Sequence, residues 1–401
     1  MTGNKDQSAI VNGKLLLPGG MARDGSILIR DGIIAALGDR DPVPRDIPVL
    51  DAGGKYVAPG FIDIHVHGGG GHDFMDNTVE AFLEIARTHV RYGTTAMFPT
   101  TLTGPKEEII QTLETYEKAL PLNDSGSQFM GMHLEGPYFA MNQRGAQDPR
   151  WIRNPDPEEY EYILSKSKYI KRWSAAPELV GALEFGTLLR QRSILPSLAH
   201  TDAVYEEILE AFGHGYTLAT HLYSGMSGVT RRNAFRYAGA VESAYIIDDM
   251  DVEIIADGVH LPAPLLKLVM KIKGVSKTAL VTDAMRAAGM PPRESVIGNL
   301  HSGIRVIVED GVSKLPDRSS FAGSVATADR LIRTMTRVAG VSLPDAVRMM
   351  TETPARIMNI SNQKGSLAVG HDADIVIFDD DIVIHSTLVK GKVVYGADIF
   401  T

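Results

Sequence analysis

Histidine, glutamate and aspartate residues recur at one kind of place in this sequence, the end of a short apolar run. They are His65, His67, Glu135, His200, His221, Asp257, His260 and Asp283. The runs, among them FIDIHVH, FMGMHLE and ALVTD, are typical of buried parallel strands. Imidazole nitrogens and carboxylate oxygens are the ligands that many divalent cations take in proteins. Side chains from several strand ends would therefore form a metal site at the mouth of a barrel.

His65 and His67 are two positions apart in one such run. Because side chains of a strand alternate between its faces, both imidazoles should point the same way. Taken alone, the pair fits a half-buried strand with two hydrogen-bonded histidines as well as a metal site. Glu135 adds a carboxylate that is costly to bury without a cation, which could be a metal or an arginine. The shared position of all these residues at strand ends favours a metal.

His200 and His221 end the runs LPSLAH and TLATH, and Asp283 ends the last one. Each histidine alone would be interpreted as a hydrogen-bonded core residue. An aspartate beside a metal-bound water can accept its proton and return it to a leaving nitrogen. Asp283 could instead cap the helix that follows, since aspartate is a favoured N-cap residue. Its place at the last strand end favours the catalytic role.

The composition limits the class of protein. The 401 residues are enough for one barrel and a smaller domain, and 44% hydrophobic and 22% charged residues are typical of globular proteins. A net charge of −9 argues against a nucleic-acid surface but leaves room for an anionic substrate. With no cysteine, a metal must bind nitrogen and oxygen ligands. No signal-like start and no apolar run of ~18 residues is present, so we expect a cytoplasmic enzyme without a membrane partner.

The fold expected is α/β, a (β/α)8 TIM-type barrel with a small β-sandwich domain built from both chain ends. Apolar strands alternate with helical stretches from Phe61 onward, which implies a parallel sheet. Eight strand candidates are FIDIHVH, TTAMFPTT, FMGMHLE, IKRWSAAPE, SILPSLAH, TLATHLY, VEIIADG and TALVTD. Residues 59–351 would form the barrel. Residues 1–58 and 352–401, with their glycine turns and short strands, would pair into the sandwich.

The chain resembles the amidohydrolase superfamily and, within it, the N-acetylglucosamine-6-phosphate deacetylases. The resemblance runs over nearly the whole length. It is carried by PGFIDIHVHG (59–68), HLEGPYF (133–139), RGAQDPRWI (144–152), AAPE (175–178), HTDA (200–203), THLYSGMS (220–227), IADGVH (255–260), VTDAMRAAG (281–289), FAGS (321–324) and KGSLAVGHDADIVIF (364–378). HLEGP together with VTDAM is fairly specific for the deacetylases, whereas the histidine pair with a final aspartate is common to the superfamily.

The resemblance implies a site and a reaction. Glu135, His200 and His221 would hold the main divalent metal, and His65 and His67 a second one. Zinc or iron is favoured, with manganese or cobalt as further candidates. Asp283 would take a proton from the attacking water and give it to the departing amine, releasing acetate. Residues implied to contact the substrate are Ala146, Gln147, Ser224, Gly225, Arg231, Arg232, Asp257, Gly258, His260, Phe321, Ala322 and Gly323.

Two stretches depart from the family pattern. Ser224-Gly225 stands where relatives have Asn-Ala beside the sugar phosphate, which removes the asparagine side chain but leaves backbone N–H groups for an anion. In the segment 230–236, Arg232 matches a family arginine near the phosphate, and Arg231 replaces a histidine. These arginines suit a phosphate or carboxylate, or they form a solvated loop. Gln147 often aligns with histidine, and His72 matches no family role.

The sequence therefore predicts a metal-dependent deacetylase of N-acetylglucosamine 6-phosphate. One alternative keeps the chemistry with another substrate, such as N-acetylgalactosamine 6-phosphate, another N-acyl sugar or an N-acyl amino acid. A second alternative is a non-catalytic homologue that binds a sugar phosphate, although a complete set of ligands with Asp283 argues against it. The resemblance also suggests a homodimer in which residues of the neighbour lie near the phosphate.

Overall fold

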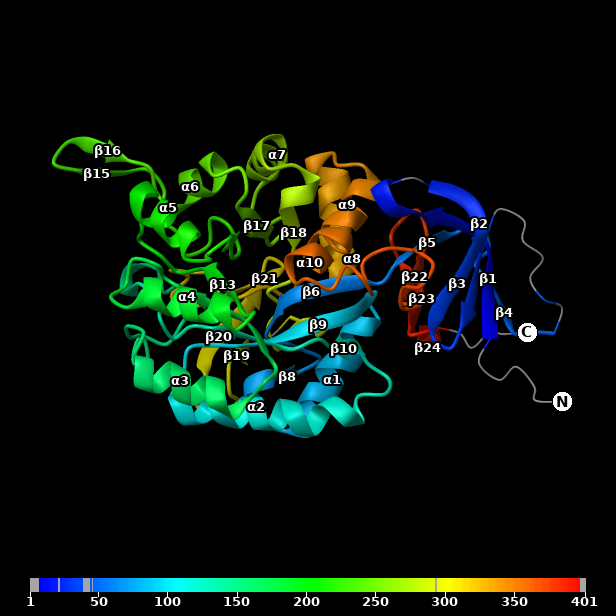
Figure 1. Cartoon of the computed structure of the whole chain (residues 1–401), viewed down its shortest axis with the longest axis horizontal. Helices are drawn as coiled ribbons and strands as arrows, with labels where there is room; N and C mark the ends of the chain where they lie inside the picture. The colour runs from blue at the N-terminus through cyan, green and yellow to red at the C-terminus, as the bar shows by residue number, and fades with distance from the viewer. Residues whose placement is uncertain (1–6, 21, 39–43, 45, 293, 397–401) are drawn as a thin grey trace.

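The computed structural model describes residues 7–20, 22–38, 44, 46–292 and 294–396. The outer ends of the predicted sandwich segments, residues 1–6 and 397–401, lie outside the described residues. A barrel surrounded by helices occupies one side of the molecule, and a smaller sheet lies beside it (Figure 1). The first and last strands of the chain lie together in that smaller sheet.

Eight parallel strands form the barrel. They are β6 (Phe61–Val66), β9 (Thr94–Thr101), β11 (Met132–Glu135), β12 (Ile170–Ala175), β13 (Leu195–Leu198), β14 (Leu218–Ala219), β17 (Asp251–Ile254) and β18 (Thr278–Leu280). Seven of them fall within one of the predicted apolar runs, and β17 begins one residue before the run VEIIADG. The first and last strands meet where Val66 bridges Ala284 and the Asp283 amide donates to the His65 carbonyl at 2.9 Å. The barrel prediction is confirmed.

Helices cover the outside of the barrel (Figure 1). They are α1 (Val79–Val90), α2 (Lys106–Ala119), α3 (Pro157–Lys166), α4 (Ala182–Gln191), α5 (Tyr205–Gly213), α6 (Ala240–Ile246), α7 (Ala263–Ile272), α8 (Ala328–Thr334), α9 (Leu343–Met349) and α10 (Glu352–Ile357). In α1, Phe82, Ile85 and His89 are spaced three and four positions apart and are buried together. The Thr78 hydroxyl caps this helix by accepting from the Ala81 amide at 3.2 Å.

The barrel interior contains a buried ion pair. Arg172 of β12 and Glu253 of β17 are both fully buried and bonded to each other. Arg172 also donates to the Ile64 carbonyl at 3.1 Å and to the hydroxyls of Ser197 and Thr220 at 2.9 and 2.8 Å. The cation therefore joins four strands below the mouth of the barrel, with every bond made inside the protein.

The smaller sheet is mixed and uses both ends of the described chain. Its order is β24-β23-β22-β5-β1-β2-β3, with β4 paired to β1. The bounds are β1 (Gln7–Leu16), β2 (Ala22–Arg30), β3 (Ile33–Gly38), β4 (Val49–Asp51), β5 (Tyr56–Pro59), β22 (Ile375–Phe378), β23 (Ile384–Val389) and β24 (Lys392–Gly396). Its strands enclose one apolar core that includes Ile10, Ile27, Val57, Ile375 and Leu388. The predicted β-sandwich from both chain ends is thus confirmed.

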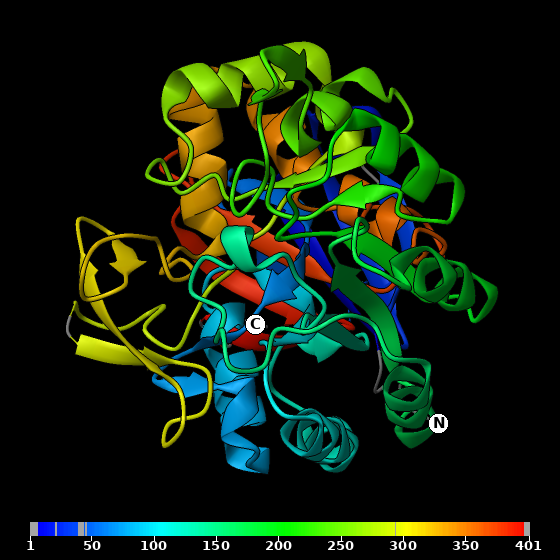
Figure 2. The same ribbon diagram turned by 90° about the vertical axis from the view of Figure 1, so that its left-hand side faces the viewer.

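Two insertions interrupt the barrel pattern. The hairpin of β15 (Thr230–Arg232) and β16 (Phe235–Tyr237) projects beyond the helices (Figure 1). A three-stranded sheet of β19 (Glu294–Ile297), β20 (Ile304–Glu309) and β21 (Val312–Lys314) lies at one side of the barrel when it is viewed from the end opposite the smaller sheet (Figure 2). Within the described ranges, no helix is long and apolar enough to cross a membrane.

Candidate metal centre and substrate pocket

The polar strand ends meet around one cavity of about 480 Å³. His67, Glu135, His200, His221 and Asp283 line it. They follow or end β6, β11, β13, β14 and β18, so the parallel arrangement brings residues far apart in sequence to the same mouth. His65, one strand repeat before His67, is completely buried directly beneath them.

Glu135 is the centre of this group. Its Oε1 lies 2.9 Å from His221 Nε2, 3.3 Å from His200 Nε2 and 3.6 Å from His65 Nε2. Its Oε2 lies 3.3 Å from His67 Nε2. Four imidazoles therefore surround the Glu135 carboxylate. Among the described residues, the partners of Glu135 are these histidines and Gln147 rather than an arginine.

Asp283 lies on the other side of the histidine pair. Its Oδ1 is 3.2 Å from His67 Nε2 and 3.5 Å from His65 Nε2, and the two imidazole Nε2 atoms are 3.1 Å apart. The structure thus brings Asp283 into the same group as the histidines, at the distance expected for ligands or proton partners of a shared site.

Three of the strand-end residues have left-handed backbone conformations. The φ angles are 46° at His200, 31° at His221 and 46° at Asp283. Such angles are unfavourable for residues with a Cβ and are found at functional sites where surrounding structure holds them in place. They turn the chain sharply as each strand ends, so that the side chain is directed into the mouth while the backbone leaves it.

Bonds from outside the group orient two of its members. The His200 Nδ1 lies 2.7 Å from the Gln143 carbonyl, which can only accept, so Nδ1 carries the proton and Nε2 is left for a ligand bond. The Thr103 amide donates to Gln147 Oε1 at 2.8 Å, which fixes the orientation of that side-chain amide. Gln147 Nε2 then donates to Glu135 Oε2 at 2.8 Å. Gln147 supports the Glu135 carboxylate and retains a second N–H.

The charges of the group favour a cation, because two buried carboxylates lie among the imidazoles. Burial lowers the pKa of His65, but the neighbouring Glu135 and Asp283 carboxylates raise it to about 9 overall. Burial likewise lowers the pKa of His67, and its bonds to Asp283 and Glu135 raise it to about 10. Burial raises the pKa of Glu135, yet His65 and the other imidazoles hold it well below its usual range. The buried carboxylates thus favour positive charge beside them, either on the imidazoles or on a cation held between them.

The donor set fits a divalent metal. Ligand atoms of His65, Glu135 and His221 lie within 4.8 Å of one another, and so do those of His65, His67 and Asp283. The Nδ1 atoms of His65, His67 and His221 are buried without a hydrogen-bond partner among the described residues, and that of His65 lies 3.6 Å from Glu253 Oε2. All ligands are nitrogen or oxygen, which zinc, iron, manganese and cobalt accept.

Of the residues implied to contact a sugar, His260, Phe321 and Gly323 form one wall of the cavity, whereas Asp257, Gly258 and Ala322 are not part of its lining. Asp257 accepts from the Val259 and His260 amides, and its Oδ2 is 2.8 Å from His260 Nδ1, leaving the His260 Nε2 side for the cavity. His260 lines the cavity and packs on the Phe321 ring at 4.6 Å. Gly323 also lines it, Ala322 is buried in the apolar cluster behind, and Gly258 has a φ of 81° in the turn before His260.

Ser224 and Gly225 also line the cavity, as do Ala146 and Gln147. Gly225 has a φ of 57°, and a Cβ built there would come within 2.6 Å of His200 Nδ1 and 2.8 Å of the Gln143 carbonyl. The glycine in this departure from the family pattern is therefore required locally, because a side chain would press on the bond that orients His200.

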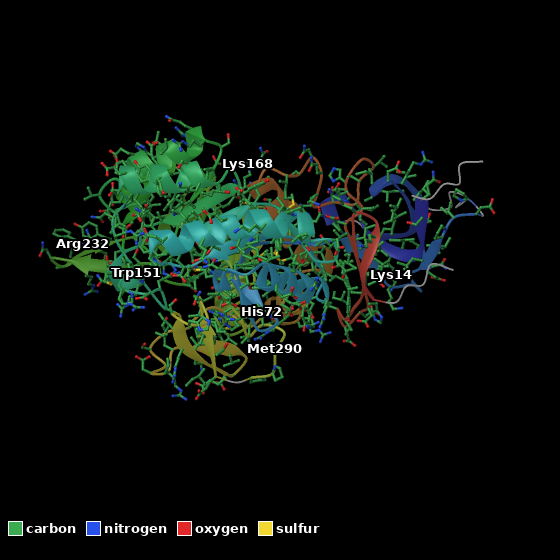
Figure 3. The ribbon with its side chains drawn as sticks, turned by 90° about the horizontal axis from the view of Figure 1, so that it is seen from below. Lys14, His72, Trp151, Lys168, Arg232 and Met290 are labelled. Carbon is green, nitrogen blue, oxygen red and sulfur yellow. The ribbon has the colours of Figure 1, made fainter. Side chains whose placement is uncertain are left out.

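Arg231 and Arg232 do not lie beside the other predicted site residues of the same chain. Both are exposed on the β15–β16 hairpin, which extends away from the barrel, and Arg232 lies over the Tyr237 ring (Figure 3). The cavity is lined by Lys314 and Arg318 instead, from the end of β21 and the turn after it. Neither residue belongs to a sequence motif, so no pattern in the sequence points to them. His72 lies in β8 (His72–Asp73), which pairs with β7 (Gly68–Gly69), and is not part of the cavity lining.

Comparison with known proteins agrees with this geometry. The model of the amidohydrolase family matches residues 56–394. The chain belongs to this family. It is 33% identical to the N-acetylglucosamine-6-phosphate deacetylase of Vibrio furnissii over 368 residues, which cover 92% of this chain and 90% of the relative. It is also 30% identical to the N-acetylgalactosamine-6-phosphate deacetylase of Shewanella sp. (strain ANA-3) over 402 residues, 99% of each chain.

The fold of this family member also matches solved deacetylases. A variant of the Mycobacterium smegmatis N-acetyl-D-glucosamine-6-phosphate deacetylase, solved in complex with N-acetyl-D-glucosamine-6-phosphate, superposes with a TM-score of 0.88 at 27% identity. The match covers 98% of this chain and all of that one. The resemblance to the N-acetylglucosamine-6-phosphate deacetylases is thus confirmed. The chain is an amidohydrolase of the amino-sugar-phosphate deacetylase branch.

Proposed function

We propose that the protein hydrolyses the N-acetyl group of an amino sugar 6-phosphate, with N-acetylglucosamine 6-phosphate as the first candidate. The observation that carries the proposal is the grouping of Glu135, Asp283 and four imidazoles at the mouth of one barrel. N-Acetylgalactosamine 6-phosphate is the second candidate, because relatives named for either substrate are about equally similar to this chain.

The site residues would have different roles in amide hydrolysis. Glu135, His200 and His221, with His65 and His67, would hold one or two divalent cations, which lower the pKa of a water and polarise the acyl carbonyl. Asp283 accepts the proton of the attacking water and delivers it to the amine nitrogen as the C–N bond breaks. Its pKa supports the first role, since burial raises it but His65 and His67 hold it below the usual value, so the carboxylate is ionised.

Two further residues position the substrate. Gln147 holds Glu135 with one amide N–H and lines the cavity, so its second N–H could donate to the acyl oxygen. His260, fixed through Nδ1 by Asp257, presents Nε2 to the sugar hydroxyls. Both residues would hold the substrate in place. The rate depends on the alignment of the acyl group with the attacking water, and a misplaced acyl group loses that alignment.

Acetate release tests the proposal. The purified protein, loaded with zinc, is assayed with N-acetylglucosamine 6-phosphate, N-acetylgalactosamine 6-phosphate, N-acetylglucosamine and an N-acetyl amino acid. Turnover of one phosphorylated sugar well above the unphosphorylated control supports the proposal and selects the epimer. Turnover of the N-acetyl amino acid alone would replace it. Binding of a sugar phosphate without any acetate release would favour a non-catalytic role.

Glu135→Gln tests the ligand assignment separately. Removing the charge at the centre of the imidazole group should reduce the zinc bound per chain, measured by atomic absorption after gel filtration. Gln147→Ala is the matched comparison, because it removes a supporting bond and no ligand. Full zinc occupancy in Glu135→Gln would contradict the assignment of Glu135 as a ligand.

A further inference from the structure

The cavity has a cationic end that the proposed chemistry does not use. Lys314 and Arg318 are the lysine and arginine residues among the described residues that line it. They lie on the wall formed by Lys314, Arg318, Ser319, Ser320 and Phe321, beyond the insertion β19–β21. The carboxylates of the lining, Glu135 and Asp283, belong to the candidate metal centre. Outside that centre, the lysine and the arginine are the lining side chains that could pair with an anionic substituent of the substrate.

The segment 314–321 is a closed turn rather than a loose loop. Lys314 bridges Phe321 in antiparallel fashion, the Leu315 amide donates to the Ser320 carbonyl at 3.0 Å, and the Arg318 amide donates to the Leu315 carbonyl at 2.8 Å. The same segment continues into Gly323, which lines the cavity. The two cations are thus held at a fixed place relative to the sugar wall.

Both cations are already oriented by acidic partners that do not line the cavity. Glu309 lies 3.3 Å from Lys314 Nζ and accepts from Arg318 Nε and Nη2 at 2.9 and 3.2 Å. Asp310 accepts from Lys314 at 2.7 Å. These bonds engage two of the five guanidinium donors, so three donors of Arg318 and the third ammonium proton of Lys314 are left for another anion.

We propose that Lys314 and Arg318 of the same chain bind the 6-phosphate of the substrate, with the turn 314–321 as the phosphate-binding segment. The inference rests on the proposed function and names the anion contact of that site. A forked guanidinium beside an ammonium is a suitable receptor for a phosphate dianion. The hairpin arginines Arg231 and Arg232 could serve only from a second copy of the chain, because they do not line the cavity and their hairpin projects beyond the barrel helices (Figure 3).

The test compares Lys314→Met and Arg318→Met with the wild-type protein. Each variant should raise KM for the phosphorylated N-acetyl sugar by ~10- to 100-fold, the scale of a lost charge-assisted hydrogen bond. KM for the unphosphorylated sugar and kcat for both should stay near the wild-type values. Arg318→Lys, which keeps the charge, should recover part of the loss. Arg337→Met is the matched control, as Arg337 is an exposed arginine paired with Asp381 outside the cavity.

A binding measurement separates this inference from the proposed reaction. Inorganic phosphate is titrated into the metal-free wild-type protein and both variants by calorimetry. Weaker phosphate binding in Lys314→Met and Arg318→Met supports the anion site even if no sugar is deacetylated. Unchanged phosphate affinity and unchanged KM in both variants would overturn it. A rise in KM in Arg232→Met alone would also overturn it, and would assign the phosphate to the hairpin of a second copy.

Discussion

The buried pair of Arg172 and Glu253 allows a prediction with a definite sign. Arg172→Met leaves the Glu253 carboxylate in the barrel interior, where burial raises its pKa and Arg172 and His65 together lower it below its usual value. Breaking a buried ion pair on one side costs about 3–5 kcal/mol of unfolding free energy. Glu253→Leu should cost a similar amount, because it leaves a buried guanidinium without its counter-ion.

The double variant Arg172→Met/Glu253→Leu should recover part of that loss. Both charges are gone, and the hydroxyls of Ser197 and Thr220 still have Ser174 Oγ at 2.7 and 3.3 Å. The Ile64 carbonyl loses its donor, which costs about 1–3 kcal/mol. We therefore expect the double variant to be about 2 kcal/mol more stable than Arg172→Met.

Urea unfolding at constant pH measures this cycle. The midpoint and slope of each variant give the free-energy differences, provided that the slope is unchanged. A double variant that loses as much as the sum of the two single variants would refute the reasoning, because the pair would then not be coupled. Glu253 Oε2 is also 3.6 Å from His65 Nδ1, so zinc affinity measured on the same variants shows whether the pair reaches the metal centre.

Three further predictions concern the site itself. Asp283→Asn should keep zinc and substrate binding but lose at least ~10²-fold in kcat, the scale of general acid–base catalysis. Gly225→Ala should lower activity by ~10²-fold, since its Cβ displaces His200 and small misplacements are costly. Apparent zinc affinity should rise with pH up to about 9, because the protons on His65 and His67, with pKa values of about 9 and 10, must leave before a cation binds.

Each of these has a clear contrary result. Near-normal turnover of Asp283→Asn would remove Asp283 from the proton transfers. Normal zinc binding and activity in Gly225→Ala would mean that the turn relaxes without moving His200, and Gly213→Ala, with open space around its Cβ, is the matched control. A zinc affinity that is flat between pH 6.5 and 9 would show that the two imidazoles are neutral in the metal-free protein.

The barrel was predictable because its strands are short apolar runs bounded by polar residues. Strand β6 within FIDIHVH and strand β18 at the start of TALVTD have no exposed residue, and a parallel sheet buried on both faces selects such runs. Because all eight strands point the same way, knowing that a residue ends a strand also places it at the mouth. The site residues at strand ends could therefore be grouped before any geometry was known.

The two inserted sheets were less predictable because their strands are not buried on both faces. Strand β20 alternates partly exposed and buried residues, and β15 and β16 are largely exposed, so their sequences carry little of the apolar signal. Lys314 and Arg318 follow such segments, and their direction depends on how the inserted sheet packs on the barrel. For Arg231 and Arg232 the residue types were informative but their position was not. A basic cluster suggests a site that binds an anion, but the sequence does not give the direction in which the hairpin extends.

The pairing of β5 with β22 has a consequence for synthesis on the ribosome. The paired residues Pro59 and Ile375 are 375 − 59 = 316 positions apart. At ~5–20 residues per second, the nascent chain carries β5 for ~16–63 s before its antiparallel partner is translated. During this time one edge of the first five strands is open to pairing with another chain. Strands β22–β24 therefore cover the β5 edge only at the end of synthesis, because they are the last of the described strands to be made.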